Sequence, residues 1–252
     1  MTDRWRVFAN LATLANGLLG VGAVLYTLAG NPLWAMLLIV CAIGFDGWDG
    51  ILSRRSATRP SRFGRVADSV ADATSFGIAP AVLIAVHTAN TSTWAPWEPV
   101  ALALAAVYLA AALARLTYFT ARAFERPYFV GVPTPESALA LVVALLFHDT
   151  PAFQSVQPIG VFVGVVILSV MMVAPVPYPK IRRGSPLRLP MAATAAFAAL
   201  ALVPLQFHLA TGSALYEFAY GASFALLIGV ASYYLLGPFT VERHGAPASK
   251  AA

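Results

Sequence analysis

Long apolar stretches alternate with short polar or Pro/Gly-rich breaks along most of the chain. Most stretches approach the roughly 20 residues that a helix needs to cross the hydrocarbon core of a bilayer. The breaks contain Gly-Asn-Pro, Arg-Pro, Pro-Thr-Pro and Thr-Gly sequences, all of which interrupt helices. The pattern predicts an all-α fold, a polytopic transmembrane helical bundle with about eight spans. We place these spans at residues 8–29, 31–53, 65–88, 97–121, 134–148, 157–176, 188–206 and 213–237.

Composition strengthens this interpretation and excludes a soluble globular domain. Apolar residues make up 59% of the chain and charged residues only 11%, whereas soluble domains carry about 25% charged residues. The net charge of +5 reflects topology and anionic lipid head groups rather than nucleic acid. With eight spans, all sixteen Lys and Arg residues fall on one side of the membrane. The positive-inside rule makes that side the cytoplasm and places both termini there.

Two pairs of aspartates interrupt the apolar pattern. Asp46 and Asp49 lie three residues apart near the end of the second span, and Asp68 and Asp72 lie four residues apart in the third. Either spacing places both members of a pair on one helix face. An ionised aspartate inside a span costs about 2.5–3.5 kcal/mol, and four such charges repel one another. The aspartates therefore either pair with the arginines of the intervening loop or surround cations.

Hard divalent cations suit this cluster because Mg²⁺ prefers oxygen ligands and leaves positions for water and substrate phosphate. Four carboxylates on two adjoining helices can hold two ions about 3.5–4 Å apart, an arrangement that serves in-line displacement at phosphorus. Gly47, Gly50 and Ser53 reduce the side-chain bulk beside the acids, which lets a pyrophosphate approach the backbone. For any single aspartate a salt bridge remains the simpler interpretation, but the set of four favours metal-assisted phosphoryl transfer.

The acidic segment resembles the signature of the CDP-alcohol phosphatidyltransferase family. That signature reads Asp-x2-Asp-Gly-x2-Ala-Arg, followed after eight residues by Gly-x3-Asp-x3-Asp. Seven of the eight fixed positions are present here: Asp46, Asp49, Gly50, Arg54, Gly64, Asp68 and Asp72. Ser53 stands where the signature has Ala, and nine residues rather than eight separate Arg54 from Gly64.

The resemblance implies a membrane enzyme that transfers a phosphatidyl group from CDP-diacylglycerol to a small alcohol and releases CMP. It implies two bound Mg²⁺ or Mn²⁺ ions, held by Asp46, Asp49, Asp68 and Asp72. Asp72 is also the implied proton acceptor. The implied head-group contacts are Gly50, Arg54 and Ser61. Asn10 and Thr13 resemble the Asn-x2-Thr start of the first family helix, which adds Asn10 to the substrate site.

Further stretches resemble the serine-using branch of the family, among them Ala114–Phe119 and Tyr128–Pro135. They favour serine over glycerol phosphate or inositol phosphate as the acceptor. Arg115 lies inside the fourth span, where an arginine is expected to face a polar cavity, a carboxylate or a phosphate. It either binds the acceptor carboxylate or a lipid phosphate, or snorkels to the head groups. Glu136 either meets the serine ammonium or caps its helix.

Combining the spans with the resemblance, we expect a six-helix catalytic core over residues 1–185, followed by two additional spans and a cytoplasmic tail over 186–252. The expected location is a bacterial or archaeal cell membrane, with the active site on the cytoplasmic side. The expected partners are CDP-diacylglycerol, a small alcohol and membrane lipids, without nucleic acid, and a homodimer is a candidate assembly. A secondary transporter is the alternative class, but it would place carboxylates near the bilayer middle on repeated helices.

Overall fold

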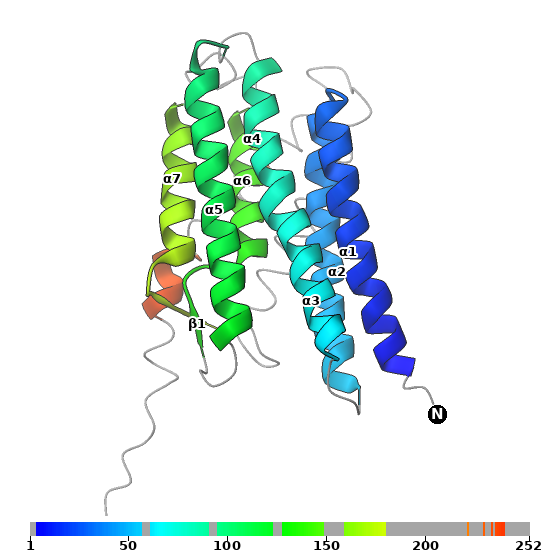
Figure 1. The fold of residues 1–252 in the computed structure, drawn as a ribbon. Helices are drawn as coiled ribbons and strands as arrows, with labels where there is room; N and C mark the ends of the chain where they lie inside the picture. Colours follow the sequence, from blue (N-terminus) through cyan, green and yellow to red (C-terminus); the bar gives the residue numbers. More distant parts are fainter. Residues whose placement is uncertain are drawn as a thin grey trace, which may run out of the picture.

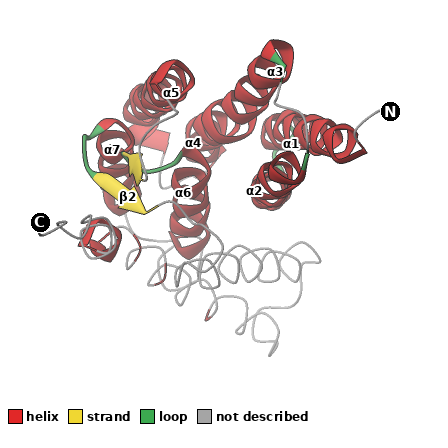
Figure 2. Ribbon diagram, turned by 90° about the horizontal axis from the view of Figure 1, so that it is seen from below, coloured by secondary structure: helices red, strands yellow, loops and turns green. Residues whose placement is uncertain are grey.

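The computed structural model describes residues 4–56, 61–90, 95–122, 128–148 and 159–179, with eight further positions between 221 and 239. Its helices run side by side as a bundle (Figure 1). The helices are α1 (Arg4–Leu28), α2 (Pro32–Arg55), α3 (Arg62–Asp72), η1 (Ala73–Ile78), α4 (Ala79–Asn90), η2 (Ala95–Trp97), α5 (Glu98–Arg122), α6 (Thr134–His148) and α7 (Ile159–Val173). Viewed along the bundle, α1 and α2 form one side, α5 and α7 the other, and α4 and α6 lie between them (Figure 2).

The helical fold agrees with the predicted membrane character. Four helical segments are long and apolar enough to cross a bilayer: Arg4–Leu28, Pro32–Arg55, Arg62–His87 and Glu98–Tyr118. Two shorter apolar helices, Thr134–His148 and Ile159–Val173, match the fifth and sixth expected spans. The expected spans at 188–206 and 213–237 lie outside the described residues, apart from isolated positions in the second. The total of eight therefore stays a prediction.

The sharp turn between α1 and α2 follows from three consecutive residues, Gly30-Asn31-Pro32. Gly30 adopts a φ of +76°, a backbone conformation that glycine tolerates best. The Gly30 N–H donates to Thr27 O at 3.0 Å and the Asn31 N–H donates to Tyr26 O at 2.9 Å, the paired bonds that close a helix end with a left-handed residue. Pro32 then starts α2 at a position where no backbone donor is needed.

The third predicted span is one continuous rod made of α3, η1 and α4, and η1 is a π-helical turn. Sequence patterning predicted a regular helix here. Contacts from two other helices stabilise the wider turn, because Ser75 Oγ donates to the Asn16 carbonyl on α1 at 2.7 Å and Tyr108 Oη on α5 donates to the Phe76 carbonyl at 3.2 Å. Such turns within helices are frequent at functional sites, and this one follows Asp72 directly.

Two short strands, which the sequence analysis did not predict, add to the helical fold. Strand β1 (Tyr128–Val130) pairs antiparallel with β2 (Pro177–Pro179), so the segments that follow α5 and α7 meet at one end of the bundle (Figure 1). Gly131 (φ +72°) makes the turn out of β1, and a Cβ at this position would lie 2.9 Å from the Met172 carbonyl carbon. Pairing between segments so far apart in sequence leaves no local pattern by which three-residue strands could be predicted.

Apolar side chains both fill the centre of the bundle and cover its outside. Met36, Ile39 and Leu83 are fully buried in the central cluster, whereas Leu18 and Leu25 on α1 are 62% and 61% exposed. In water such a surface would be unfavourable, but lipid chains cover it without cost. The arrangement is that of a membrane protein.

Candidate active site

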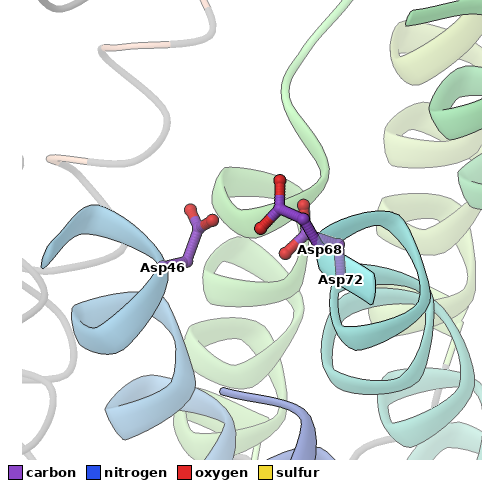
Figure 3. Close-up of side chains that lie close together, drawn as sticks. All are labelled: Asp46, Asp68 and Asp72. Atoms are coloured by element: carbon purple, nitrogen blue, oxygen red, sulfur yellow. The ribbon is translucent and has the colours of Figure 1, made fainter. Parts of the chain in front are cut away.

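Three of the four predicted acidic residues converge between α2 and α3. One carboxylate oxygen from each of Asp46, Asp68 and Asp72 lies within 4.8 Å of the other two. Figure 3 shows Asp46 on α2 facing Asp68 and Asp72 on α3, with a further helix, α6, beginning behind them. The i and i+4 spacing brings the two α3 residues onto one face, and the contact of α2 and α3 with α1 brings the two acidic segments together.

The acids lie toward one end of the bundle rather than at its middle. Asp46 is nine residues before the end of α2 and Asp68 is six residues after the start of α3. At 1.5 Å per residue, both lie within about 15 Å of the helix ends. Asp68 in particular lies well before the middle of the rod formed by α3, η1 and α4.

Asp49, the fourth acid, lies beside this group of three. Its carboxylate accepts a hydrogen bond from Thr13 Oγ1 on α1, and it is within hydrogen-bonding range of Asp68. Thr13 also donates to the Ala9 carbonyl at 3.2 Å, so its hydroxyl is shared between its own helix and the acid. Asp49 thus connects the three converging carboxylates to α1.

Asn16 is a site residue that sequence reasoning missed. Its side chain is fully buried, and Nδ2 donates to Asp72 Oδ1 at 2.9 Å. The Asn16 carbonyl accepts the bond from Ser75, so one residue holds both Asp72 and the π-turn that follows it. The sequence feature that could have indicated Asn16 is an amide inside a membrane span. It lies three residues after Thr13 and hence on the same helix face.

The predicted head-group residues occupy the ends of α2 and α3. The exposed Arg54 side chain folds back over Gly50, where a Cβ would lie 3.4 Å from Arg54 Nη1. Ser61 caps α3, because its Oγ accepts a hydrogen bond from the Gly64 N–H at 2.9 Å. Asn10 is exposed near the start of α1, and the α1 contacts to the acids come from the next turns, through Thr13 and Asn16.

Arg115 is buried within the protein, with 6% of its surface exposed. Its Nη1 donates to Thr134 Oγ1 at 3.4 Å, and its guanidinium carbon lies 6.0 Å from the centre of the Phe129 ring. This burial is contrary to snorkelling, which would leave the guanidinium at the protein surface. Glu136, in the first turn of α6, interacts electrostatically with both Arg115 and Asp46.

The donor set fits a divalent cation. Asp46, Asp68 and Asp72 offer three carboxylate oxygens in a small volume, and oxygen is the ligand that Mg²⁺ and Mn²⁺ prefer. Three carboxylates this close together repel one another when they are ionised, and a cation between them would offset that repulsion. The convergence of the three aspartates therefore favours cation binding.

Fold and site together define a helical membrane protein with a cluster of carboxylates toward one end of the bundle. The sequence model of the family described as CDP-alcohol phosphatidyltransferase matches residues 6–230. The chain therefore belongs to this family of phospholipid-synthesising enzymes, which confirms the resemblance of the acidic motif.

Individual relatives narrow the comparison. The chain is 28% identical over 180 residues to the CDP-diacylglycerol–serine O-phosphatidyltransferase of Helicobacter pylori, an alignment that covers 70% of this chain and 73% of that one. It is 35% identical over 127 residues to the protein of the same name from Mycobacterium leprae, which covers 49% and 41%. It is 25% identical over 173 residues to the archaetidylserine synthase of Methanothermobacter thermautotrophicus, which covers 68% and 69%.

Proposed function

We propose that this enzyme transfers the phosphatidyl group of CDP-diacylglycerol to L-serine, forming phosphatidylserine and releasing CMP. The observation that carries the proposal is the convergence of Asp46, Asp68 and Asp72 from two helices whose sequences match the family signature. The names of the bacterial relatives support serine as the acceptor. The buried Arg115 supports an acceptor that carries a carboxylate.

In this proposal the four aspartates hold two Mg²⁺ or Mn²⁺ ions. These ions, when bound, neutralise the pyrophosphate and stabilise the charge that develops on the departing oxygen. Asp46, Asp68 and Asp72 supply the converging oxygens, and Asp49 completes the set from beside Asp68. Asn16 orients Asp72 through the bond to Oδ1.

The protein residues then bind and orient the two substrates. Arg54, held over Gly50, pairs with the pyrophosphate oxygens in a two-point contact. Ser61 and Asn10 lie at the helix ends where the rest of the cytidine head group would bind.

Transfer is a single displacement at the lipid-bearing phosphorus. The serine hydroxyl oxygen forms a bond to this phosphorus as the bond from phosphorus to the bridging pyrophosphate oxygen breaks. CMP leaves with that oxygen and its electron pair. The hydroxyl proton passes to the Asp72 carboxylate. We infer that the reaction takes place on the cytoplasmic side, because the basic loops mark that side.

The direct test is CMP release by purified protein in detergent, with CDP-diacylglycerol, L-serine and Mg²⁺ or Mn²⁺. We expect release to require both serine and cation and to stop when the cation is chelated. Asp46→Asn, Asp68→Asn and Asp72→Asn should each reduce turnover by several orders of magnitude, since charge stabilisation by metal contributes several kcal/mol. The matched control is Glu98→Gln, which changes an exposed acid at the start of α5 and should leave turnover unchanged.

Two outcomes would contradict the proposal. Faster release with glycerol 3-phosphate or inositol phosphate than with serine would assign another acceptor. Full activity in any of the three aspartate variants would remove that residue from the metal site.

A second donor is worth testing because one relative is named an archaetidylserine synthase. Its lipid differs from diacylglycerol in backbone chemistry, while the head-group reaction stays the same. Offering CDP-diacylglycerol and CDP-archaeol at equal mole fractions in the same micelles measures the preference. A higher kcat/KM for the archaeol form would assign the chain to the ether-lipid donor.

A further inference from the structure

Glu136 has a feature that the proposed transfer reaction does not use. It lies at the third position of α6, where one carboxylate oxygen is engaged by the residue's own backbone N–H. The other oxygen, Oε2, is out of contact with solvent and accepts no hydrogen bond within the described part of the chain. A buried carboxylate oxygen that lacks a donor is costly. Helix capping therefore accounts for one carboxylate oxygen of Glu136 but not for Oε2.

The charges around Glu136 indicate which donor would bind. Asp46 of the acidic group is close enough to interact with it electrostatically, so a second negative side chain lies near Glu136. Arg115 also interacts electrostatically with Glu136 and is itself buried. Thr134, two residues before Glu136, holds Arg115 Nη1. The first turn of α6 therefore contacts the buried Arg115 through Thr134 and carries the buried Glu136, next to the acidic centre.

We propose that Glu136 and Arg115 form a subsite for a zwitterionic amino alcohol. The acceptor ammonium binds to Glu136 Oε2, the acceptor carboxylate binds to Arg115, and the hydroxyl points toward Asp46 and Asp72. An ammonium supplies the donor that Oε2 lacks and a positive charge between Glu136 and Asp46. Arg115 offers a planar pair of donors for the carboxylate.

This inference deepens the proposed function and rests on it, because it assigns the groups that recognise the acceptor. It makes Glu136 a determinant of specificity for the α-amino group. A site built to pair with a charged group discriminates strongly against an analogue that lacks the group, since its own buried charge is then left alone. An acceptor without the ammonium, or without the carboxylate, should therefore bind poorly.

The test compares Glu136→Gln and Arg115→Lys with wild type, using CMP release at saturating cation. Two serine analogues are added as competitors: 3-hydroxypropionate, which lacks the ammonium, and ethanolamine, which lacks the carboxylate. We expect Glu136→Gln to reduce kcat/KM for serine roughly ten- to hundredfold while the KM for CDP-diacylglycerol stays within about twofold. Glu136→Gln should also narrow the difference in binding between serine and 3-hydroxypropionate. Arg115→Lys should instead narrow the difference in binding between serine and ethanolamine.

The controls separate recognition from folding. Glu98→Gln removes an exposed first-turn glutamate from another helix and should change neither substrate constant. Mn²⁺ binding to each variant, measured by electron paramagnetic resonance, and thermal unfolding report whether the acidic centre and the bundle survive. If Glu136→Gln fails to fold, Glu136→Asp keeps the charge on a shorter stem and should show the serine defect alone.

The outcomes are distinct from those of the proposed function. No serine-dependent CMP release by wild type would overturn the function itself. Serine-dependent release with unchanged acceptor discrimination in Glu136→Gln would overturn only the subsite. An equal loss of kcat/KM for serine and for CDP-diacylglycerol would also overturn the subsite, because it would mean that Glu136 only supports the local structure around Arg115.

Discussion

At the scale of single residues, the acidic centre depends on side chains from α1 that carry no charge. Asn16 and Thr13 each donate to one of the aspartates. A hydrogen bond to a carboxylate fixes which of its oxygens faces the neighbouring carboxylates. The centre is thus supported by a layer of neutral donors behind the acids.

We predict that Asn16→Ala reduces kcat roughly ten- to hundredfold, because a hydrogen bond to a charged group contributes about 1.5–3 kcal/mol. Its Mn²⁺ affinity should fall as well, since Asp72 loses the donor that orients it. Both quantities can be measured, by CMP release and by titration with Mn²⁺. The matched control is Thr27→Ala, which removes another buried polar side chain from α1. Its hydroxyl donates to the Ala23 carbonyl at 2.8 Å, within its own helix.

Equal effects of the two α1 variants on Mn²⁺ affinity would show that Asn16 acts through general stability. A loss confined to Asn16→Ala would assign the orienting role to the amide.

The acidic residues could be predicted from the sequence, but their neighbours could not. Four carboxylates in apolar spans stand out because each is costly there, and three of them do converge. The sequence leaves the role of Arg115 open, because its burial depends on where Phe129 and Thr134 lie in space. Asn16 carries no recognisable motif in the sequence, and only the fold places its partner Asp72 beside it.

At the scale of elements, the sequence predicts where the helices begin and end to within a few residues, but it does not predict the π-helical turn η1. α6 begins and ends at the predicted residues, 134 and 148, and α5 differs from its prediction by one residue at each end. Pro and Gly set such ends locally. The π-turn depends on bonds from Asn16 and Tyr108, which are far away in sequence.

The close approach of α1 to the π-turn makes Gly20 a sensitive position. A Cβ at Gly20 would lie 2.7 Å from Ser75 Cα, so Gly20→Ala must push α1 away from η1. We predict a loss of stability of about 1–3 kcal/mol, read as a lower unfolding temperature in detergent, together with weaker Mn²⁺ binding. Gly164→Ala on α7 is the control, because a Cβ there meets nothing within 4 Å.

If Gly20→Ala and Gly164→Ala unfolded at the same temperature, the close contact between α1 and η1 would not limit the side chain at position 20.

At the scale of the whole molecule, the bundle has two unlike ends. One end holds the acidic centre, Arg54 and the β1–β2 pair, and the other holds the turn at Gly30 and the start of α5 (Figure 1). The arginines that the structure describes lie on segments at the first end: the start of α1, the end of α2, the start of α3 and the second half of α5. Charge asymmetry of this kind sets membrane orientation.

We predict that the acidic end faces the cytoplasm. In a background in which Cys41 is replaced, Asn31→Cys should react with a membrane-impermeant thiol reagent in intact cells, since Asn31 is exposed at the opposite end. Arg4→Cys, at the exposed start of α1, should react only after the cells are broken. The reverse pattern of labelling would invert the orientation, and labelling of both sites in intact cells would contradict a spanning α1.

The shallow position of the acids has a kinetic consequence. Asp46 and Asp68 lie within about 15 Å of the helix ends, so the reacting phosphorus of a bilayer lipid can meet them without leaving its leaflet. The nucleotide lipid then arrives by lateral diffusion in two dimensions, whereas a small polar acceptor arrives through water in three. Doubling the volume of buffer dilutes only the second reactant, and adding inert lipid dilutes only the first. The KM for the nucleotide lipid is therefore a mole fraction in the membrane, whereas the KM for the polar acceptor is a molar concentration in the buffer.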